Sequence, residues 1–305
     1  MTSVRKKHVG RVICCGDLML EHMSGCLGSR GTTSIVDVSS MDLGGGAFNI
    51  AWYLSALGHR AALVAPTGPC DRRKVASHCK TGGITFRPLV VPGARLDILL
   101  ASISGRGHAS LYLRSRLTRP NKGVPIRGAG AIVVTGSRHD EMRSYWNDQL
   151  ASADGLLRVF VPSYSVFDYS TKQVRAFLSN SDVVFLNKQE HLHLRALLGA
   201  KAIETLLPKN GVLVVTKGHE GANAYTTHGS LAVAAVSRST ADVVGAGDAF
   251  AAAFISGILD DDSLERCGMR AAAIAALVVK SSEPRIRIPR RSLARWSRKA
   301  GAETN

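Results

Sequence analysis

Short apolar runs alternate with amphipathic stretches along most of the chain. The runs end near a turn or a polar residue, and they cover residues 12–15, 61–65, 131–135, 157–161, 183–186 and 212–216. Between several of them lie stretches with helical spacing, such as Ile50, Ala51, Leu54 and Leu57. This alternation predicts an α/β fold in which helices flank a mostly parallel central sheet.

Two segments, residues 18–43 and 96–118, do not follow this alternation. In the second, Leu111 and Leu113 alternate with Tyr112 and Arg114, a period of two that suits a strand with one solvated face. We assign both segments to a small β lid on a single domain of residues 1–305, because no repeat or low-complexity linker separates two halves. An exposed lid sheet also offers a pairing surface for a homodimer.

Composition is that of an ordinary globular protein, with 45% hydrophobic and 20% charged residues. The longest apolar run, residues 271–279, is too short to cross a bilayer, and the basic start lacks the pattern of a secretory signal. The six cysteines show neither metal-finger spacing nor a disulfide framework, which indicates reduced thiols. We therefore expect a cytoplasmic protein without a membrane partner.

The formal net charge of +16 favours anionic partners, whether phosphorylated metabolites, nucleotides or nucleic acid. Much of the excess lies after residue 284, where basic residues surround a single aromatic residue, Trp296. A nucleic-acid platform usually interleaves more aromatic residues, so the pattern favours a solvated basic tail over nucleic-acid binding.

The segment 242–250 carries the most chemistry. Apolar residues after Gly245 form one stripe of a helix, so Gly245, Ala246 and Gly247 sit at a helix N-terminus that can hold a phosphoryl group. Asp248 lies in the first turn, where an ionised carboxylate can accept the proton of a hydroxyl. The alternative is a tight loop with Asp248 as a capping residue, because Gly-Ala-Gly also occurs at 128–130 without a following Asp.

Residues 242–250 resemble the C-terminal signature of ribokinase-like (PfkB) carbohydrate kinases, Asp-Thr-x-Gly-Ala-Gly-Asp-x-Phe, with Val243 in place of Thr. The resemblance runs from about residue 12 to residue 280. It implies a Rossmann-type three-layer fold, ATP as donor, Asp248 as catalytic base, and an anion hole formed by the three preceding residues. It also implies that Asp242 borders a loop for a monovalent cation, K⁺.

Two motifs near the N-terminus resemble the family's acceptor-binding signatures. In residues 44–49, Gly45, Gly46 and Asn49 would contact the acceptor's hydroxyls, although a glycine turn before a helix explains the pattern equally. In residues 16–21, Asp17 and Glu21 follow the first strand, where carboxylates face the ligand crevice. The sequence of this stretch is similar to that of heptose-phosphate kinases. Glu21 stands where the family has Asp, and its longer side chain would shift an acceptor hydroxyl. The alternative is an ordinary surface turn.

Two further motifs resemble the family's nucleotide and metal segments. Asn187 and Glu190 match Asn-x-x-Glu, which positions Mg²⁺ through water, whereas a polar helix start is the alternative. Thr216, Gly218 and Gly221 match Thr-x-Gly-x-x-Gly, which would present a hydroxyl and backbone N–H groups to the nucleotide. The alternative here is a simple hairpin turn.

Together these motifs predict an ATP-dependent kinase that phosphorylates a hydroxyl of a sugar or sugar phosphate. Arg114 and Arg116, on one face of the expected lid strand, could meet a phosphate already on the substrate, although exposed strand edges often carry basic residues that oppose aggregation. A nucleoside kinase of the same family is the first alternative. The second is a non-catalytic binding protein with a basic nucleic-acid-binding tail, which the departures at Glu21 and Val243 suggest.

Overall fold

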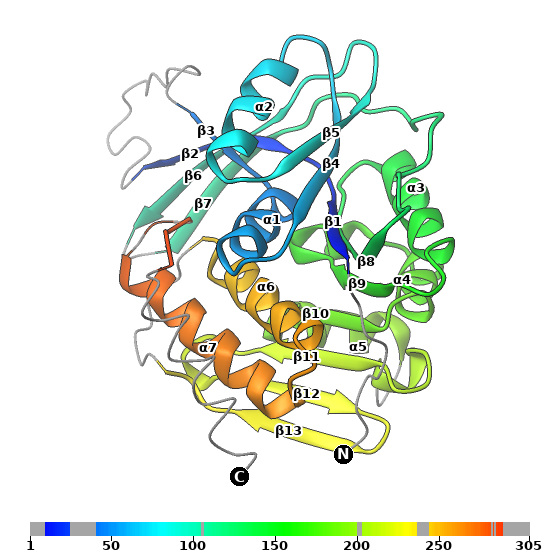
Figure 1. Ribbon diagram of the computed structural model, residues 1–305, viewed down its shortest axis with the longest axis vertical. Helices are drawn as coiled ribbons and strands as arrows, with labels where there is room; N and C mark the ends of the chain where they lie inside the picture. Colours follow the sequence, from blue (N-terminus) through cyan, green and yellow to red (C-terminus); the bar gives the residue numbers. More distant parts are fainter. Residues whose placement is uncertain are drawn as a thin grey trace.

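A nine-stranded sheet forms the centre of the molecule (Figure 1). The computed structural model describes residues 10–24, 41–104, 107–199, 203–236, 244–281, 283 and 285–288. The strand order is β13-β12-β11-β10-β9-β8-β1-β4-β5, parallel from β5 to β11, with β12 and β13 antiparallel at one edge. The strands are β1 (Arg11–Cys15), β4 (Ala61–Thr67), β5 (Thr85–Val90), β8 (Ala129–Thr135), β9 (Leu157–Val161), β10 (Val183–Asn187), β11 (Val212–Thr216), β12 (Ala222–Thr226) and β13 (Gly229–Val233). The predicted mostly parallel sheet is therefore confirmed.

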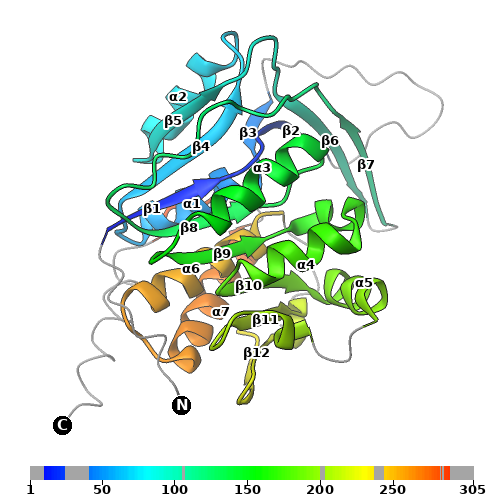
Figure 2. The ribbon, with the colours of Figure 1, turned by 90° about the vertical axis from the view of Figure 1, so that its right-hand side faces the viewer.

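Helices cover both faces of this sheet, as the two ribbon views show together (Figures 1 and 2). One face packs against α1 (Gly46–Ala56), α2 (Arg72–Thr81), α6 (Ala246–Leu259) and α7 (Leu264–Ser281). The other face packs against α3 (Asp140–Ala151), α4 (Thr171–Ser179) and α5 (Lys188–Leu198). Short 3₁₀ turns are η2 (Ser163–Asp168), η3 (Ile203–Leu206) and η4 (Gly218–Glu220). This is the three-layer arrangement that the family resemblance implied.

The central strands are apolar along their whole length because both of their faces are buried. In β1, Val12 and Cys14 join the core beneath α1 and α6, whereas Ile13 and Cys15 join the core beneath α3 and α4. A strand that alternates between two cores has no position that favours a polar residue. The same reasoning explains the continuous apolar runs of β8, β10 and β11.

A second sheet of four strands, called here the small sheet, projects from the main sheet (Figure 2). Its order is β3-β2-β6-β7, with β2 (Met19–Ser24), β3 (Asp42–Gly44), β6 (Asp97–Ser104) and β7 (Gly107–Leu113). Both predicted lid segments contribute to it, and residues 25–40 of the first lie outside the described residues. β2 and β6 are parallel, and the outer pairs are antiparallel.

The prediction that Arg114 and Arg116 lie on a lid strand was wrong. β7 ends at Leu113, so Arg114 and Arg116 follow the strand rather than lying on it. Leu111 and Leu113 are exposed, 53% and 46% respectively, while the polar Tyr112 turns inward to a buried carboxylate. The polar side chain of β7 faces inward here because Asp97 on the neighbouring strand β6 offers its hydroxyl a partner.

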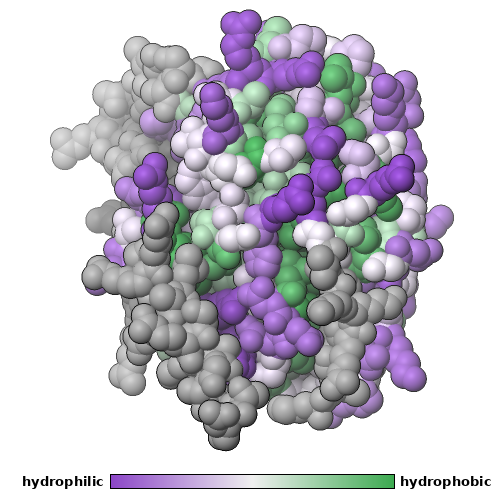
Figure 3. Space-filling model, in the orientation of Figure 1, coloured by the Kyte–Doolittle hydropathy of each residue, from purple (hydrophilic) through white to green (hydrophobic). Residues whose placement is uncertain are grey.

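Hydrophilic and apolar side chains are interspersed on the face seen in Figure 3. The most hydrophilic area at the top of that view covers the outer side of α2, which exposes Arg72 and Arg73. In the described part of the chain, no helix has both the length and the apolar character needed to span a bilayer. Of the five cysteines described there, Cys70 is exposed and the other four are buried and unpaired.

Candidate active site

The predicted phosphate-binding turn does form a helix N-terminus. Gly245 caps α6 in the left-handed conformation (φ 88°), and the backbone N–H of Ala249 returns to its carbonyl at 2.9 Å. Gly247 is exposed, and an added Cβ there would meet nothing within 4 Å. The first N–H groups of α6 have no partner within the helix, and the described residues leave open space at Gly247, which fits a phosphate. Asp242 lies outside the described residues.

Asp248 lies in the first turn of α6 and faces the start of α1. Asn49 Nδ2 donates to Asp248 Oδ2 at 2.8 Å, although 199 residues separate the two side chains. Asn49 is only 2% exposed, whereas Asp248 is half-buried. The first residue of α1, Gly46, is also close, because an added Cβ would lie 3.4 Å from Asp248 Oδ1. Two helix N-termini thus meet at the predicted base.

Glu21 reaches the same place from β2 in the small sheet. Its Oε1 accepts from the backbone N–H of Gly45 at 3.2 Å, and its carboxyl group occupies the space that a side chain at residue 44 would fill. Gly44 therefore makes room for the longer side chain of Glu21. Gly45 has φ 112°, and an added Cβ would lie 2.7 Å from the carbonyl oxygen of Asp17. Glycine is required at residue 45 for both reasons.

Arg285 joins this group from the segment after α7, which the sequence analysis assigned to a solvated tail. Its Nη1 donates to Asn49 Oδ1 at 2.9 Å, and its Nη2 pairs with Asp42. The sequence analysis missed this residue, since the one available signal was an arginine in a basic, proline-containing stretch. We refer to Asp248, Asn49, Glu21 and Arg285 as the base cluster.

The charges of the base cluster oppose one another. Burial raises the pKa of Asp248 to about 6, although the hydrogen bond from Asn49 and the charge of Arg285 lower it. Burial likewise raises the pKa of Glu21 to about 7, where Arg285 acts to lower the pKa and the Asp248 carboxylate acts to raise it. Arg285 therefore supplies positive charge beside both Glu21 and Asp248.

Asp17 belongs to a different group, which links β1, the small sheet and the β8–α3 connection. Ser137 Oγ donates to Asp17 Oδ2, and the backbone N–H of His139 donates to Ser137 Oγ at 3.0 Å. His139 Nε2 lies 2.9 Å from Asp97 Oδ2, and the hydroxyl of Tyr112 donates to the same oxygen at 2.6 Å. We refer to these five residues as the lid-root network.

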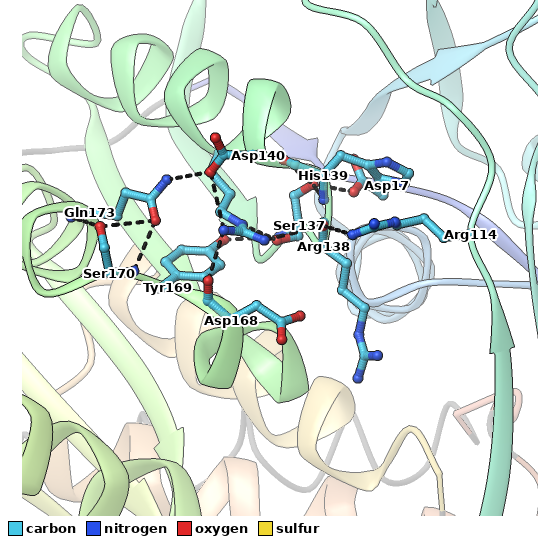
Figure 4. A network of polar contacts seen from close by, with 11 residues as sticks. Asp17, Arg114, Ser137, Arg138, His139, Asp140, Asp168, Tyr169, Ser170 and Gln173 are labelled. Carbon is cyan, nitrogen blue, oxygen red and sulfur yellow. Dashed lines mark hydrogen bonds and ion pairs between the residues drawn. The ribbon is translucent and has the colours of Figure 1, made fainter.

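The lid-root network is extended by charged side chains around Ser137 (Figure 4). Arg143 Nε donates to the carbonyl of Ser137 at 3.1 Å, and the hydroxyl of Tyr169 accepts from the Ser137 N–H at 2.9 Å. Arg114 donates to the carbonyl of Arg138 at 3.0 Å. The sequence analysis singled out only Asp17 here and expected Arg114 to bind a substrate phosphate, whereas in the structure Arg114 holds a loop carbonyl.

Asn187 and Glu190 form a reciprocal cap on α5. The Glu190 carboxylate accepts from the Asn187 backbone N–H at 2.9 Å and from Nδ2 at 2.7 Å, while Asn187 Oδ1 accepts from the Glu190 N–H at 2.8 Å. This arrangement is the polar helix start that we kept as an alternative. Burial nevertheless raises the pKa of Glu190 to about 7, and the nearby Asp248 contributes to the rise. The Glu190 carboxylate is therefore close enough to Asp248 for the two charges to repel each other.

Thr216 ends β11 directly beside Asn187, its register partner in β10. Gly218 begins the turn η4 with φ 59° and open space around its α-carbon. Gly221 has φ 89°, and an added Cβ would lie 2.1 Å from the carbonyl of Val233, so close packing of β13 requires glycine there. Thr216 and Gly218 thus lie at the carboxyl end of β11 and in the turn that follows it, whereas Gly221 has a structural reason of its own.

Among the residues that the structure describes, no group of three or more His, Cys, Asp or Glu side chains could hold a metal ion. A cavity of about 470 Å³ lies beside the base cluster, behind Arg285. It is lined by Asp42, Phe48, Trp52, Ser77, His78, Thr81, Glu283 and Arg285.

Sequence comparison agrees with this geometry. The chain matches the model of the pfkB family carbohydrate kinases over residues 10–291. A nucleoside kinase of Methanocaldococcus jannaschii is 29% identical over 131 residues, which are 43% of each chain. A nucleoside kinase of Methanothermobacter thermautotrophicus is 24% identical over 270 residues, which are 83% of this chain and 85% of the relative.

Structural comparison gives the same fold. The nucleoside kinase of Burkholderia thailandensis, solved in complex with inosine, is similar with a TM-score of 0.78 and 20% identity. The similarity covers 95% of this chain and 97% of that one. Because the family match spans nearly the whole described fold, the chain belongs to the pfkB family of carbohydrate kinases, phosphotransferases that act on hydroxyl groups.

Proposed function

We propose that this chain transfers the γ-phosphate of ATP to a hydroxyl of a sugar or a nucleoside, with Asp248 as the general base. The observation that carries the proposal is the meeting of two helix N-termini at Asp248, next to the exposed glycine tip of α6. Such a place favours the negative charge of a phosphoryl group and positions a base beside it.

In this mechanism the acceptor oxygen attacks the γ-phosphorus, and the bond from that phosphorus to the bridging oxygen of ADP breaks. The hydroxyl proton passes to Asp248. A carboxyl group with a pKa of about 6 is ionised at neutral pH, yet it is more basic than an ordinary aspartate. The backbone N–H groups at the tip of α6 would hold the transferred group, whose charge is spread over its oxygens.

The nucleotide would lie on the side of Asn187, Thr216 and Gly218. These residues end neighbouring strands or begin the following turn, as expected for a ligand at the carboxyl edge of a parallel sheet. Magnesium supplies charge neutralisation on the triphosphate when bound. Both oxygens of Glu190 already accept hydrogen bonds from Asn187, so these residues suit contact through water rather than a direct bond to the ion.

The acceptor would contact Asp17, Glu21, Gly45, Gly46 and Asn49. Asp17 is 5% exposed and held by the Ser137 hydroxyl, and its backbone carbonyl lies against Gly45 at the start of α1. An uncharged acceptor is favoured over a sugar phosphate, because Arg114 is exposed and bound to a loop carbonyl, and Arg116 is exposed as well. The nucleoside kinases among the relatives make nucleosides the first class to consider.

A transfer screen with ATP and Mg²⁺ over nucleosides, free sugars and sugar phosphates tests this proposal. We expect an uncharged acceptor to be turned over fastest. A sugar phosphate that outpaces all of them would contradict the acceptor class. Absence of transfer to every acceptor, together with salt-sensitive binding of nucleic acid, would instead support the non-catalytic alternative.

We extend the proposal to a homodimer that forms through the small sheet. Its edge strand β7 exposes Leu111 and Leu113, and an unpaired edge with apolar side chains is a natural pairing surface. Leu111→Arg should shift the protein to a monomer in analytical ultracentrifugation. Val90→Arg is the matched control, since Val90 is 56% exposed on β5, the edge of the other sheet. A monomeric wild-type protein would contradict this part of the proposal.

A further inference from the structure

The segment after α7 is bound to the body of the protein rather than solvated. The carbonyl of Ile286 accepts from Trp52 Nε1 at 3.3 Å, and the backbone N–H of Ile286 donates to the hydroxyl of Tyr53 at 3.2 Å. The side chain of Ile288 is buried against the core that contains α1 and α6. These contacts fix the backbone of residues 285–288 along one side of α1.

The side chain of Arg285 is held in one orientation by three different contacts. Its guanidinium donates to Asn49 Oδ1, pairs with Asp42, and lies 5.1 Å from the centre of the Phe48 ring. The side chain is 7% exposed, whereas that of Asp42 is 57% exposed. A guanidinium that is mostly withdrawn from water next to a half-exposed partner is not an ordinary surface ion pair.

The contact with Asn49 determines which way the Asn49 amide faces. Because the guanidinium can only donate, it must meet the amide oxygen, and the amide nitrogen is then directed to the carboxylate of Asp248. The hydrogen bonds therefore run in one direction, from Arg285 to the Asn49 oxygen and from the Asn49 nitrogen to Asp248. Without Arg285 the amide would lose the partner that holds its oxygen away from the carboxylate.

We propose that Arg285 is a positioning residue of the phosphotransfer site, which orients Asn49 toward the catalytic base and places a fixed positive charge beside the base. This inference rests on the proposed function of Asp248. Arg285 acts through Asn49 and by its charge. The titratable groups around it come from β2, β3, α1, α2, α6 and its own segment: Glu21, Asp42, Tyr53, His78, Asp248 and Glu283.

The first test compares Arg285→Met and Arg285→Lys with Arg287→Met, a matched control at an exposed neighbouring arginine. We expect Arg285→Met to lower kcat about 10- to 100-fold with a smaller change in KM, and to move the acidic limb of the kcat/KM profile up by about one pH unit, because Asp248 loses a cation. Arg285→Lys should keep the limb near the wild-type position and recover part of kcat. Arg287→Met should match wild type in both respects.

The cavity behind Arg285 allows a second test by chemical rescue. Arg285→Ala would leave the guanidinium site open to this cavity of about 470 Å³. Guanidinium ion at tens of millimolar, below denaturing levels, should restore activity in a saturable way in this variant and have no such effect on Arg287→Met. The inference is contradicted if guanidinium restores no activity. It is also contradicted if potassium chloride at the same ionic strength restores as much activity as guanidinium does.

A third measurement does not need turnover. The destabilisation caused by Arg285→Met should grow between pH 5 and pH 8, because Asp248 and Glu21 ionise there without their cation. A pH-independent loss would mean that Arg285 only packs and hydrogen-bonds, and would overturn the inference. If the wild-type protein phosphorylates no acceptor, the proposed function fails while this measurement still decides the role of the charge. If wild type is active and Arg285→Met equals Arg287→Met, the inference fails alone.

Discussion

Asp248 in the base cluster and Asp97 in the lid-root network are both withdrawn from water, but their acidities move in opposite directions. Burial raises the pKa of Asp248 to about 6. Burial would also raise that of Asp97, which is 1% exposed, yet hydrogen bonds from His139, Tyr112 and the backbone N–H of Ser115 lower its pKa below the ordinary value. Asp97 is thus the stronger acid although it is almost completely withdrawn from the surface.

The difference indicates that the supply of donors, and not burial alone, separates the acidity of the proposed base from that of Asp97. Asp97 receives three hydrogen bonds, so its charge is stabilised in the fold. Asp248 has Asn49 as its side-chain donor and is half-buried at the tip of a helix. A carboxylate with few donors keeps free lone pairs, which a general base needs for an incoming proton.

The largest effect is expected for Asp248→Asn. The variant keeps the size of the side chain but cannot take up the hydroxyl proton, so kcat should fall about 10²- to 10⁴-fold. Binding of ATP, measured by isothermal titration calorimetry, should remain near the wild-type level, because the helix tip is intact. Turnover close to wild type would show that Asp248 is only a capping residue.

The same variant should be more stable than wild type at neutral pH. Asp248 has a raised pKa in the fold, so its contribution favours folding at low pH and is lost as the pH rises through about 6. Removal of the charge should therefore add on the order of 2 kcal/mol to the free energy of unfolding above pH 6. Below about pH 4, where the carboxyl group is protonated in both states, this gain should disappear.

Asp97→Asn should lower the free energy of unfolding at neutral pH, whereas Asp248→Asn should raise it. Asp97 has a lowered pKa, so its contribution is fully present above its ordinary pKa of about 4 and is lost as the pH falls through the lower value of the fold. Loss of the buried charge among three donors should cost about 2 to 4 kcal/mol at pH 7, measured by urea unfolding. The cost should shrink in acid.

Asp148→Asn is the matched control for this measurement. The carboxylate of Asp148 is 55% exposed and pairs with Arg119 on the surface, so its removal should change the free energy of unfolding by less than about 1 kcal/mol. If the two variants lose the same free energy of unfolding, the three hydrogen bonds to Asp97 do not stabilise its charge more than the surface ion pair stabilises Asp148.

The main sheet was predictable because its evidence is local. Each central strand is a continuous apolar run, and each following helix begins at a glycine or a polar cap. A few consecutive residues were likewise enough to predict the tip of α6 and the polar start of α5 at Asn187 and Glu190. The exposure of the two leucines of β7 was not predictable, because an alternating pattern does not say which set of side chains faces water. The residue that turns Tyr112 inward is Asp97, which lies on another strand.

Of the candidate site, only the short motifs of consecutive residues could be predicted from the sequence. Asn49 and Asp248 are 199 residues apart, so sequence could give each residue a role by resemblance but not their contact. Arg285 and His139 act through partners 236 and 42 residues away, and neither stands in a pattern with a local meaning. Family resemblance therefore suggested the groups that we propose to touch substrate, and the structure was needed to find the groups that contact them.

The smallest effect is expected where the lid-root network meets the acceptor site, at Ser137. Ser137→Ala removes the hydroxyl that donates to Asp17 Oδ2. Burial already raises the pKa of Asp17 to about 6, and this hydrogen bond acts to lower it, so its loss should raise the pKa further. Less of Asp17 would then be ionised at pH 7, and the KM for the acceptor should rise roughly 3- to 10-fold with little change in kcat.

Ser181→Ala separates this effect from a general loss of stability. Ser181 is fully buried, and its hydroxyl donates to the carbonyl of Phe177 at 2.7 Å, far along the chain from Asp17. Both variants should unfold more easily than wild type, by about 1 kcal/mol, because each loses one buried hydrogen bond. Only Ser137→Ala should change KM, and the change should diminish at pH 8, where Asp17 ionises again. An unchanged KM would mean that the lid-root network holds the small sheet in place without tuning the carboxylate at its end.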